Sequence, residues 1–450
     1  MNSFDSRMQL TRGVGWQCPL HARIAQRHQV TPCALVGIDL GTTNSSIAIL
    51  GNDGPEVVSD HQGRKSVPSE VLWLNKDTLQ VLYADNVTDE RPVFYSFKRF
   101  IGLRCVEISE PVKESLQYNL VESEDGTACL ASMKGCTISP IVLSSAVIKY
   151  LIEYASMSLQ DDTIDGAVVA VPAHFSASQK QATIEAAEQA GIQKVHLLQE
   201  PVAAALAYGI DGGSDGETVL VFDWGGGTFD VSVLQAFEGI MEILGTDGNQ
   251  FLGGDDIDQL LVNHIFPSLE SKTLDIYKRC RAAKETLASQ EQAEISVDDG
   301  SILSITRDGL ESICRPLFEN IAVVLERIGQ DLFIEWEMGP FDAIGPNVTS
   351  PSKASTSIPS NPDPWAPPPR KITKVVLVGQ ITRLPMVVEY ITRVTGVIPC
   401  CSVDPGEAVA LGAATQAGIL EGSVGSVELM DGSYSIDLHD RTTGFSNWQP

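Results

Sequence analysis

Two short segments of this chain repeat one pattern. Residues 36–43 (VGIDLGTT) and 221–228 (VFDWGGGT) each run from an apolar strand through an aspartate and a glycine turn to a threonine, and a second apolar segment follows each. From Asp39 to Asp223 is 184 positions, which is too long for the period of a solenoid and suits two similar lobes of one domain. The repetition therefore predicts two lobes with a cleft between them.

The sequence around these segments alternates between strand-like and helix-like stretches. Residues 35–39 and 46–50 are apolar runs flanking the first turn and predict a hairpin. Further on we expect a strand at 167–171, a helix from Ser176 or Ser178 to Gly191, a strand at 195–198 and an alanine-rich helix at 202–208. Such alternation predicts an α/β protein.

Composition excludes several classes of protein. The 450 residues include 58 acidic and 31 basic side chains, for a formal net charge of −27, which disfavours a nucleic-acid partner. No uninterrupted apolar run approaches the roughly 18 residues of a membrane-spanning helix, so we expect no span. Nine cysteines without a CxxC pair favour reduced thiols, although the adjacent Cys400 and Cys401 leave a redox-active pair open.

Three segments differ from the rest. Residues 1–35 carry four arginines and one aspartate, which predicts a plastid or mitochondrial transit peptide or a disordered tail, and hence an organellar or cytoplasmic location. Residues 339–370 hold nine of the 24 prolines and predict a solvated insertion, either a plain linker or a proline-recognition ligand. We therefore expect lobe I at 36–212, lobe II at 213–420 and a short tail at 421–450, which forms a terminal strand or frayed end.

The repeated turns combine the groups that a nucleoside triphosphate requires. These are glycines whose backbone N–H groups can approach phosphates, hydroxyls that bond to them, and carboxylates that position hydrated Mg²⁺. The residues are Gly41, Gly225, Gly226 and Gly227, then Thr42, Thr43 and Thr228, then Asp39, Asp223 and Asp230. One such turn alone is commonly just a tight hairpin, whereas two in the same register predict phosphate binding.

Six motifs carry a family resemblance. GIDLGTTNSSIAI, VPAHFSASQKQAT, LLQEPVAAALAYG, VLVFDWGGGTFDVSVL, FLGGDDID and VLVGQITRLP resemble, in order and spacing, the 70 kDa heat-shock protein (DnaK-type chaperone) family over about residues 36–420. The resemblance implies the actin-like ATPase fold, with two duplicated α/β lobes around a cleft for ATP or ADP. Neither a Walker A sequence nor a GxGxxG fingerprint occurs at these turns, which disfavours P-loop and Rossmann folds.

The resemblance also implies roles for individual residues. Lys98, in FKRFIG, would contact the γ-phosphate, although without the motif it reads as a solvated surface lysine. The implied catalytic residues are Lys98, Glu200, Asp223 and Thr228, and the implied ligands of Mg²⁺, mostly through water, are Asp39, Glu200, Asp223 and Asp230. Potassium is a possible further cofactor. The remaining implied nucleotide contacts are Gly253, Gly254, Asp255, Lys284, Gly379 and Arg383, besides the two turns.

The adenine side departs from the family pattern. The usual Glu-x-x-Lys-Arg-x-x-x-Ser helix offers Arg281, Lys284, Glu285 and Ala288, and the usual Gly-Gly-Ser-Thr-Arg turn has Gln380 at its second position. Pro172 and Lys180 match positions that relay the nucleotide state, with Lys180 in place of Arg. We therefore expect weaker nucleotide binding than is usual for the family.

About 30 residues follow the part that resembles the ATPase domain, which predicts a protein reduced to its nucleotide-binding domain, without a peptide-binding domain. The first hypothesis is a slow Mg²⁺-dependent ATPase that assists or regulates protein folding. The second is a nucleotide sensor that barely hydrolyses and acts on other chaperones, and a sugar kinase of the same fold is a third. J-domain proteins and nucleotide-exchange factors are the implied partners.

Overall fold

The computed structural model describes residues 33–75, 78–82, 92–116, 118–132, 137–159, 163–210, 216–267, 274–297, 300–344, 368–424, 428–429 and 435–437. The predicted basic extension (1–35) lies outside these residues except for its last three. Most of the proline-rich insertion (339–370) and of the tail (421–450) lies outside them as well.

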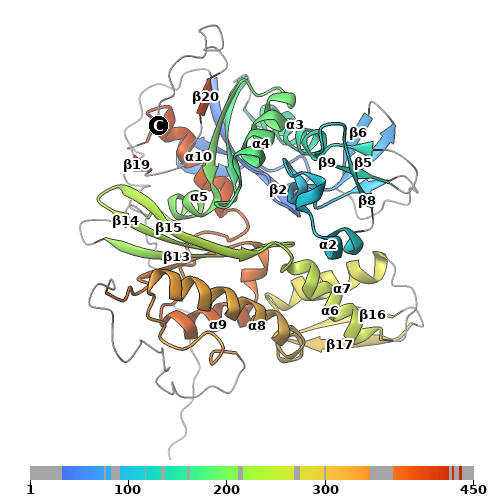
Figure 1. The fold of residues 1–450 in the computed structure, drawn as a ribbon, viewed down its shortest axis with the longest axis vertical. Coiled ribbons are helices and arrows are strands. Elements are labelled where there is room, and N and C mark those ends of the chain that lie inside the picture. Colours follow the sequence, from blue (N-terminus) through green and yellow to red (C-terminus); the bar gives the residue numbers. More distant parts are fainter. Residues whose placement is uncertain are drawn as a thin grey trace, which may run out of the picture.

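Lobe I is built on a seven-stranded sheet (upper part of Figure 1) with the order β20-β12-β11-β1-β2-β3, in which β4 also pairs with β2. Its strands are β1 (Cys33–Asp39), β2 (Asn44–Gly51), β3 (Gly54–Val57), β4 (Val67–Pro68), β11 (Thr163–Val171), β12 (Lys194–Gln199) and β20 (Ser435–Asp437). Strand β1 runs parallel to β11 and antiparallel to β2. Asp39 therefore ends a strand at the centre of the sheet.

Two smaller sheets extend lobe I, on the right of Figure 1. One is formed by β6 (Thr78–Val81), β5 (Val71–Asn75) and β7 (Val93–Phe94), and the other by β10 (Thr137–Ile138), β9 (Ala128–Ala131) and β8 (Asn119–Glu122).

Lobe II repeats the centre of lobe I. Its five-stranded sheet has the order β18-β13-β14-β15-β19, and a separate hairpin joins β16 and β17. The strands are β13 (Glu217–Trp224), β14 (Phe229–Phe237), β15 (Ile240–Asn249), β16 (Gln292–Ser296), β17 (Ile302–Thr306), β18 (Lys374–Val378) and β19 (Glu428–Leu429). Strand β13, which carries Asp223, pairs antiparallel with β14 and parallel with β18, as β1 does with β2 and β11. The predicted duplication is thus present in the topology.

Helices cover the outer faces of both sheets and fill the space between them (Figure 1). They are α2 (Glu110–Ser115), α3 (Pro140–Ser158), α4 (Ala177–Gln189), α5 (Glu200–Ala207), α6 (Gly254–Ile265), α7 (Leu274–Leu287), α8 (Arg307–Leu332), α9 (Pro385–Thr395) and α10 (Ala408–Leu420), with 3₁₀ turns η1 (Phe97–Phe100), η2 (Cys105–Glu107) and η3 (Gln380–Arg383). Ser176 is the N-cap of α4, because its hydroxyl accepts from Gln179 N and the Gln179 side chain accepts from Ser176 N. Helix α5 begins at Glu200, two residues before the predicted start, and Pro201 sits in the first turn, where its missing N–H has no helical acceptor.

Helix α3 bears on the expected absence of a membrane span. Among the described residues, this 19-residue helix alone is long and apolar enough to cross a bilayer. It packs on α4, η1 and several strands of lobe I, and it buries Leu143, Val147, Ile148 and Leu151 completely. These contacts are those of a core helix within the lobe.

The described residues form four apolar clusters. One lies within each lobe, a third lies between the two large sheets, where α5 and α10 supply most of its alanines, and a small fourth joins Ala48 and Val57 to Ala410 and Ala414. A Cβ atom at Gly412 would lie 1.7 Å from Ala203 O, and one at Gly37 would lie 2.1 Å from Ala414 N, so glycine permits backbone-to-backbone contact at both points. Helix α10, which falls in the range predicted for lobe II (213–420), packs on β1 and β2 of lobe I.

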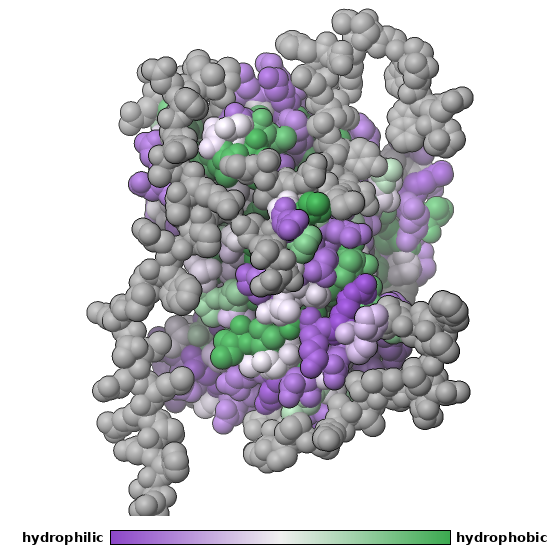
Figure 2. Space-filling model, turned by 90° about the vertical axis from the view of Figure 1, so that its left-hand side faces the viewer, coloured by the Kyte–Doolittle hydropathy of each residue, from purple (hydrophilic) through white to green (hydrophobic). Residues whose placement is uncertain are grey.

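The surface of the described residues offers mixed polarity. On the face seen in Figure 2, hydrophobic residues form separate patches among hydrophilic ones.

Cys105, Cys129, Cys280 and Cys314 are buried free thiols, and of the adjacent pair Cys400 is half-buried and Cys401 exposed, both unbridged. Burial raises the pKa of Cys314 to about 12, so this core thiol stays protonated.

Candidate functional site

A cleft of about 860 Å³ lies between the two lobes. The predicted site residues that line it are Asp39, Gly41, Thr42, Thr43, Lys98, Glu200, Asp223, Gly225, Gly226, Gly227, Thr228, Asp230, Gly254, Asp255, Lys284, Gly379 and Arg383. Gly253 is the one predicted residue outside this lining, although all of these positions are described. The structure therefore brings both glycine turns and the predicted nucleoside-side residues to one cavity.

The first turn joins β1 to β2 directly after Asp39. A Cβ atom at Gly41 would lie 1.9 Å from Asn44 O, so this turn closes only with glycine. Ser69 anchors the turn from outside, because its hydroxyl donates to Gly41 O over 2.7 Å and its N–H donates to Thr43 O over 2.7 Å. The turn is held rigid before any ligand arrives.

The second turn joins β13 to β14 and faces the first. It closes through a hydrogen bond from Gly225 N to Thr228 O (3.0 Å). A Cβ atom at Gly226 would lie 2.3 Å from Thr43 Oγ1, so the two turns are in contact across the cleft. Thr43 Oγ1 is buried and has no hydrogen-bond partner in the described structure. A buried hydroxyl in this state suits an incoming acceptor such as a phosphate oxygen.

A third segment supports the second turn from behind. The N–H groups of Gly254 and Asp255 donate to the carbonyls of Gly225 (3.0 Å) and Gly226 (2.7 Å). A Cβ atom at Gly253 would lie 2.5 Å from Gly226 O, which requires glycine there. Gly253 thus shapes the turn from behind, outside the lining of the cleft.

Acidic side chains converge around one lysine. Lys98 Nζ lies 2.6 Å from Glu200 Oε1, and both side chains are buried. Burial, and then Glu200, raise the pKa of Asp39 to about 7, against the opposing effect of Lys98. Burial and the neighbouring carboxylates Glu200, Asp230 and Asp39 raise the pKa of Asp223 well above its usual range. Burial lowers the pKa of Lys98, but Glu200 and Asp39 outweigh it, so the net shift is upward.

This charge balance fits a hydrated Mg²⁺. The carboxylates of Glu200, Asp39 and Asp223 act on the Lys98 ammonium, and that of Asp230 acts on Asp223. Burial and these neighbouring carboxylates raise the pKa values of Asp39 and Asp223, so a cation beside them would stabilise their ionised forms. No three His, Cys, Asp or Glu side chains within the described ranges converge closely enough to ligate one ion directly. Mg²⁺ keeps several of its waters in proteins, so contact through water matches this spacing.

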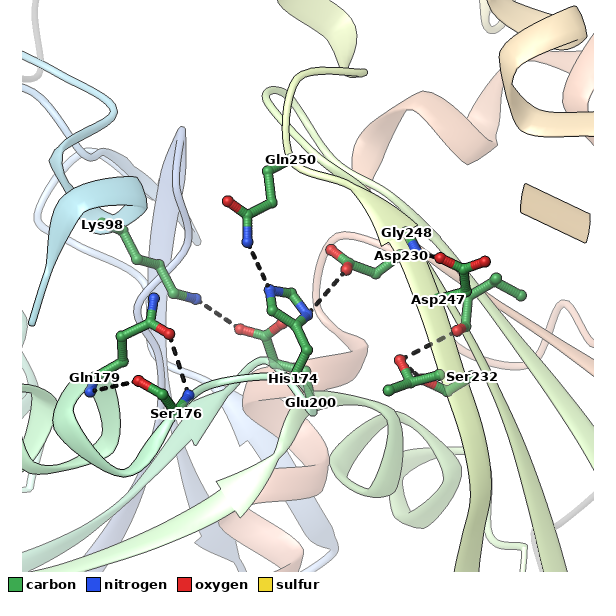
Figure 3. A network of polar contacts seen from close by, with 12 residues as sticks. Lys98, His174, Ser176, Gln179, Glu200, Asp230, Ser232, Asp247, Gly248 and Gln250 are labelled. Carbon is green, nitrogen blue, oxygen red and sulfur yellow. Dashed lines mark hydrogen bonds and ion pairs between the residues drawn. The ribbon is translucent and has the colours of Figure 1, made fainter. Parts of the chain in front are cut away.

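Sequence reasoning missed two residues that cross from lobe I to lobe II. His174 Nδ1 lies 3.3 Å from Asp230 Oδ1, and its Nε2 lies 3.2 Å from the amide nitrogen of Gln250 (Figure 3). Arg99 donates to Gly227 O over 2.6 Å. His174 stands inside VPAHFSASQKQAT and Arg99 inside FKRFIG, yet only the folded structure shows their partners.

Ion pairs within the protein occupy the opposite end of the cleft. Lys284 Nζ lies 2.6 Å from Asp258 Oδ1 and donates to Gly254 O over 3.0 Å. Arg281 contacts Asp255 and Asp258, each at 2.8 Å. Lys284 and Asp258 are almost fully buried. A ligand that sought the Lys284 ammonium would have to compete with this network.

In the turn that leads into α9, the cationic side chain is likewise paired with a carboxylate of the protein. Arg383 donates to Asp404 over 2.5 Å. Gln380 lines the cleft beside Gly379, and a Cβ atom at Gly406 would lie 3.2 Å from Gln380 Cγ. The Gln380 side chain thus stands where the family pattern has glycine.

Of the two residues implied to relay the nucleotide state, one lines the cleft. Pro172 directly follows β11 and lines the cleft. Lys180 lies on α4, where it is half-buried. Their relay role stays a prediction.

Comparisons with known proteins cover the residues of both lobes. A family model described as Hsp70 protein matches residues 35–337 and 368–443. This chain belongs to the Hsp70 family. The Hsp70 fold is the actin-like ATPase fold, and the two duplicated lobes described above are its halves.

Several curated Hsp70 relatives are similar to the chain. Chaperone protein dnaK of Thalassiosira pseudonana is 35% identical over 421 residues, covering 88% of this chain and 64% of the relative. Chaperone protein DnaK of Prochlorococcus marinus (strain MIT 9515) is 36% identical, covering 88% and 61%. Heat shock 70 kDa protein 7, chloroplastic, of Arabidopsis thaliana is 33% identical, covering 90% and 56%. The matched part of the chain therefore spans less than two thirds of each of these relatives.

Proposed function

We propose that this Hsp70-family protein binds ATP or ADP with Mg²⁺ in the inter-lobe cleft and hydrolyses ATP slowly, in the service of protein folding or its regulation. The observation that carries the proposal is the contact of two glycine turns, one from each lobe, beside a buried Lys98–Glu200 pair. Two such turns can hold a polyphosphate from both sides, which a single hairpin cannot.

The cleft residues suit phosphoryl transfer, which depends on positioning and on charge stabilisation. The N–H groups of both turns and the hydroxyls of Thr42, Thr43 and Thr228 would bind phosphate oxygens. Lys98 would offset charge that develops on the γ-phosphate, and Glu200 would keep that ammonium in place. Asp223 would orient water, and bound Mg²⁺ would supply further neutralisation of the phosphates.

We infer loose binding of the nucleoside. Lys284 and Arg383, which the resemblance assigns to the nucleotide, are each ion-paired within the protein. Losing one or two contacts worth about 1 kcal/mol each would raise Kd roughly five- to thirtyfold.

A second candidate is a nucleotide sensor that binds without appreciable turnover. The ion pairs at the nucleoside end favour it, because they leave fewer groups to fix the ligand. Under either function the proposed partners are J-domain proteins, nucleotide-exchange factors or other chaperones. The proposed location is the cytoplasm or an organelle.

Phosphate release by the purified full chain tests the first candidate. We expect Lys98→Ala and Glu200→Ala each to lower the rate at least about 100-fold. Lys113→Ala is the matched control, since Lys113 forms a surface pair with Glu110 at 2.7 Å, and it should leave the rate unchanged. Wild-type release no faster than that of either cleft variant would refute hydrolysis.

Calorimetry separates the alternatives. ATP binding without phosphate release would favour the sensor. If neither ATP nor ADP binds, both candidates fail and a scaffold role without a nucleotide remains. Phosphorylation of a small molecule in a substrate screen would point to a kinase of the same fold.

A further inference from the structure

Hydrogen-bond donors without an acceptor gather at the phosphate end of the cleft, whereas contacts within the protein occupy its nucleoside end. We propose that inorganic tripolyphosphate, bound with Mg²⁺, is a substrate of this cleft without any nucleoside attached. The inference rests on the proposed function, because it takes the cleft to hydrolyse a terminal phosphate. It adds a class of substrate that has neither a sugar nor a base.

Three donors of the two glycine turns are unpaired. In the part of the chain that the structure describes, the N–H groups of Gly226 and Gly227 donate to no acceptor. Thr43 Oγ1 is buried without a hydrogen-bond partner there, and a Cβ atom at Gly226 would lie only 2.3 Å from it. Successive peptide N–H groups beside a hydroxyl make a concave site for anions. This site binds phosphate oxygens and makes no use of a sugar or a base.

The cations at the nucleoside end have partners of their own. Lys284 Nζ lies 2.6 Å from Asp258 Oδ1, and only 6% and 1% of these two side chains are exposed. Arg383 donates to Asp404 over 2.5 Å. Breaking a buried pair leaves one charge without compensation, so a nucleoside gains little from the Lys284 ammonium.

Side chains of η3 lie against the backbone that borders the nucleoside end. A Cβ atom at Gly254 would lie 2.7 Å from Ile381 Cδ1, and one at Gly406 would lie 3.2 Å from Gln380 Cγ. Ile381 is buried and Gln380 half-buried, and both line the cleft. These side chains reduce the room for a sugar and a base, whereas tripolyphosphate needs none of that space.

The reaction at the terminal phosphorus is the same for both substrates. Water attacks this phosphorus, its bond to the bridging oxygen breaks, and the bridging oxygen leaves with the remaining diphosphate. ATP gives ADP in this way and tripolyphosphate gives pyrophosphate, each with orthophosphate, while one proton passes to solvent. The Lys98 ammonium, held by Glu200, stabilises charge on the terminal phosphate that the two substrates share.

The test compares sodium tripolyphosphate with ATP, each with MgCl₂, on the purified full chain. Calorimetry should give a Kd for tripolyphosphate within about thirtyfold of that for ATP, the ratio that one or two lost contacts produce. Ion chromatography should show pyrophosphate and orthophosphate formed in equal amounts.

Variants assign both activities to one site. Lys98→Ala should slow phosphate release from both substrates at least about 100-fold. Lys113→Ala, which alters a surface pair with Glu110, should leave both rates unchanged. Release from tripolyphosphate that survives Lys98→Ala would come from a contaminating phosphatase and would overturn the inference.

The outcomes separate this inference from the proposed function. If ATP is hydrolysed while tripolyphosphate stays intact or binds more than about thirtyfold more weakly, the inference fails and the ATPase stands. Hydrolysis of tripolyphosphate alone would support the inference and refute the ATPase. If neither compound binds, both fail.

Discussion

The two ends of the cleft treat charge in opposite ways. At the phosphate end, Asp39 and Asp223 are buried carboxyls whose pKa values are raised, and Thr43 Oγ1 lacks a hydrogen-bond partner among the described residues. At the nucleoside end, Lys284 and Arg383 already have carboxylate partners. The buried carboxyls at the phosphate end lower the stability of the folded protein when they are ionised. The charged groups at the nucleoside end are neutralised by partners within the protein.

The difference indicates where binding free energy would come from. Groups left without compensation gain most from a ligand, whereas paired groups must first give up a partner. We therefore expect affinity and turnover to depend strongly on the phosphates and the metal, and weakly on the base.

The largest contrast concerns one carboxylate at each end. Asp223→Asn should lower phosphate release about 100- to 1000-fold, because it removes a group that positions the reacting water. The same change should raise the unfolding free energy at pH 8, since it removes a buried charge that its neighbours repel. Asp404→Asn, the matched change at the nucleoside end, should alter release less than about fivefold. Similar losses of activity in both variants would show that the two ends of the cleft contribute equally to turnover.

A steric contrast comes next. A Cβ atom at Gly253 would lie 2.5 Å from the Gly226 and Gly227 backbone, whereas one at Gly406 would meet the flexible Arg383 and Gln380 side chains at 3.2 Å. Gly253→Ala should therefore lower the unfolding free energy by about 2–3 kcal/mol, and Gly406→Ala by less than about 1 kcal/mol. Urea denaturation measures both. Equal stability of the two variants would show that the phosphate end is not rigid.

The third contrast depends on pH. The pKa of Asp39 is about 7 in the folded protein, above the unfolded value of 3.8. Between these values the folded state binds the extra proton, so its stability falls as pH rises, by at most about 1.4 kcal/mol per pH unit for one carboxyl. Urea denaturation at pH 5 and pH 6.5 without Mg²⁺ should show this fall, and Asp39→Asn should reduce it. Asp404→Asn is the control, and an identical slope in both variants would contradict the assignment.

The smallest expected effect concerns the base. Replacing ATP by GTP should change Kd by less than about fivefold, because the charged groups at the nucleoside end are engaged with each other. Isothermal calorimetry on the wild type is sufficient. A preference for ATP above about 100-fold would mean that the ion pairs rearrange to read adenine.

Motifs predicted the two glycine turns that meet in the cleft, because turns carry their chemistry locally. Glycine, threonine and aspartate within eight residues already define each turn, and the duplication of the pattern predicted two lobes. The ion pairs at the other end of the cleft were not predicted. The pairing of Lys284 with Asp258, and of His174 with Asp230, joins segments whose approach only the packed fold determines.

The placement of α10 shows the same limit. It follows lobe II in the chain, yet it packs on the lobe I sheet. Its alanines and glycines predict a buried helix but do not identify the surface that buries it. Charge and turn chemistry were therefore readable in the sequence, whereas tertiary partners of small apolar residues were not.

The contact of α5 with α10 has a mechanical consequence. Where Ala203 meets Gly412, backbone touches backbone and no long side chains interlock. Sliding between such helices requires no change of rotamer, so shear at this contact should meet little resistance. Resistance to motion of one lobe against the other would then come from side-chain contacts beside the cleft, such as those of His174 with Asp230 and of Arg99 with Gly227.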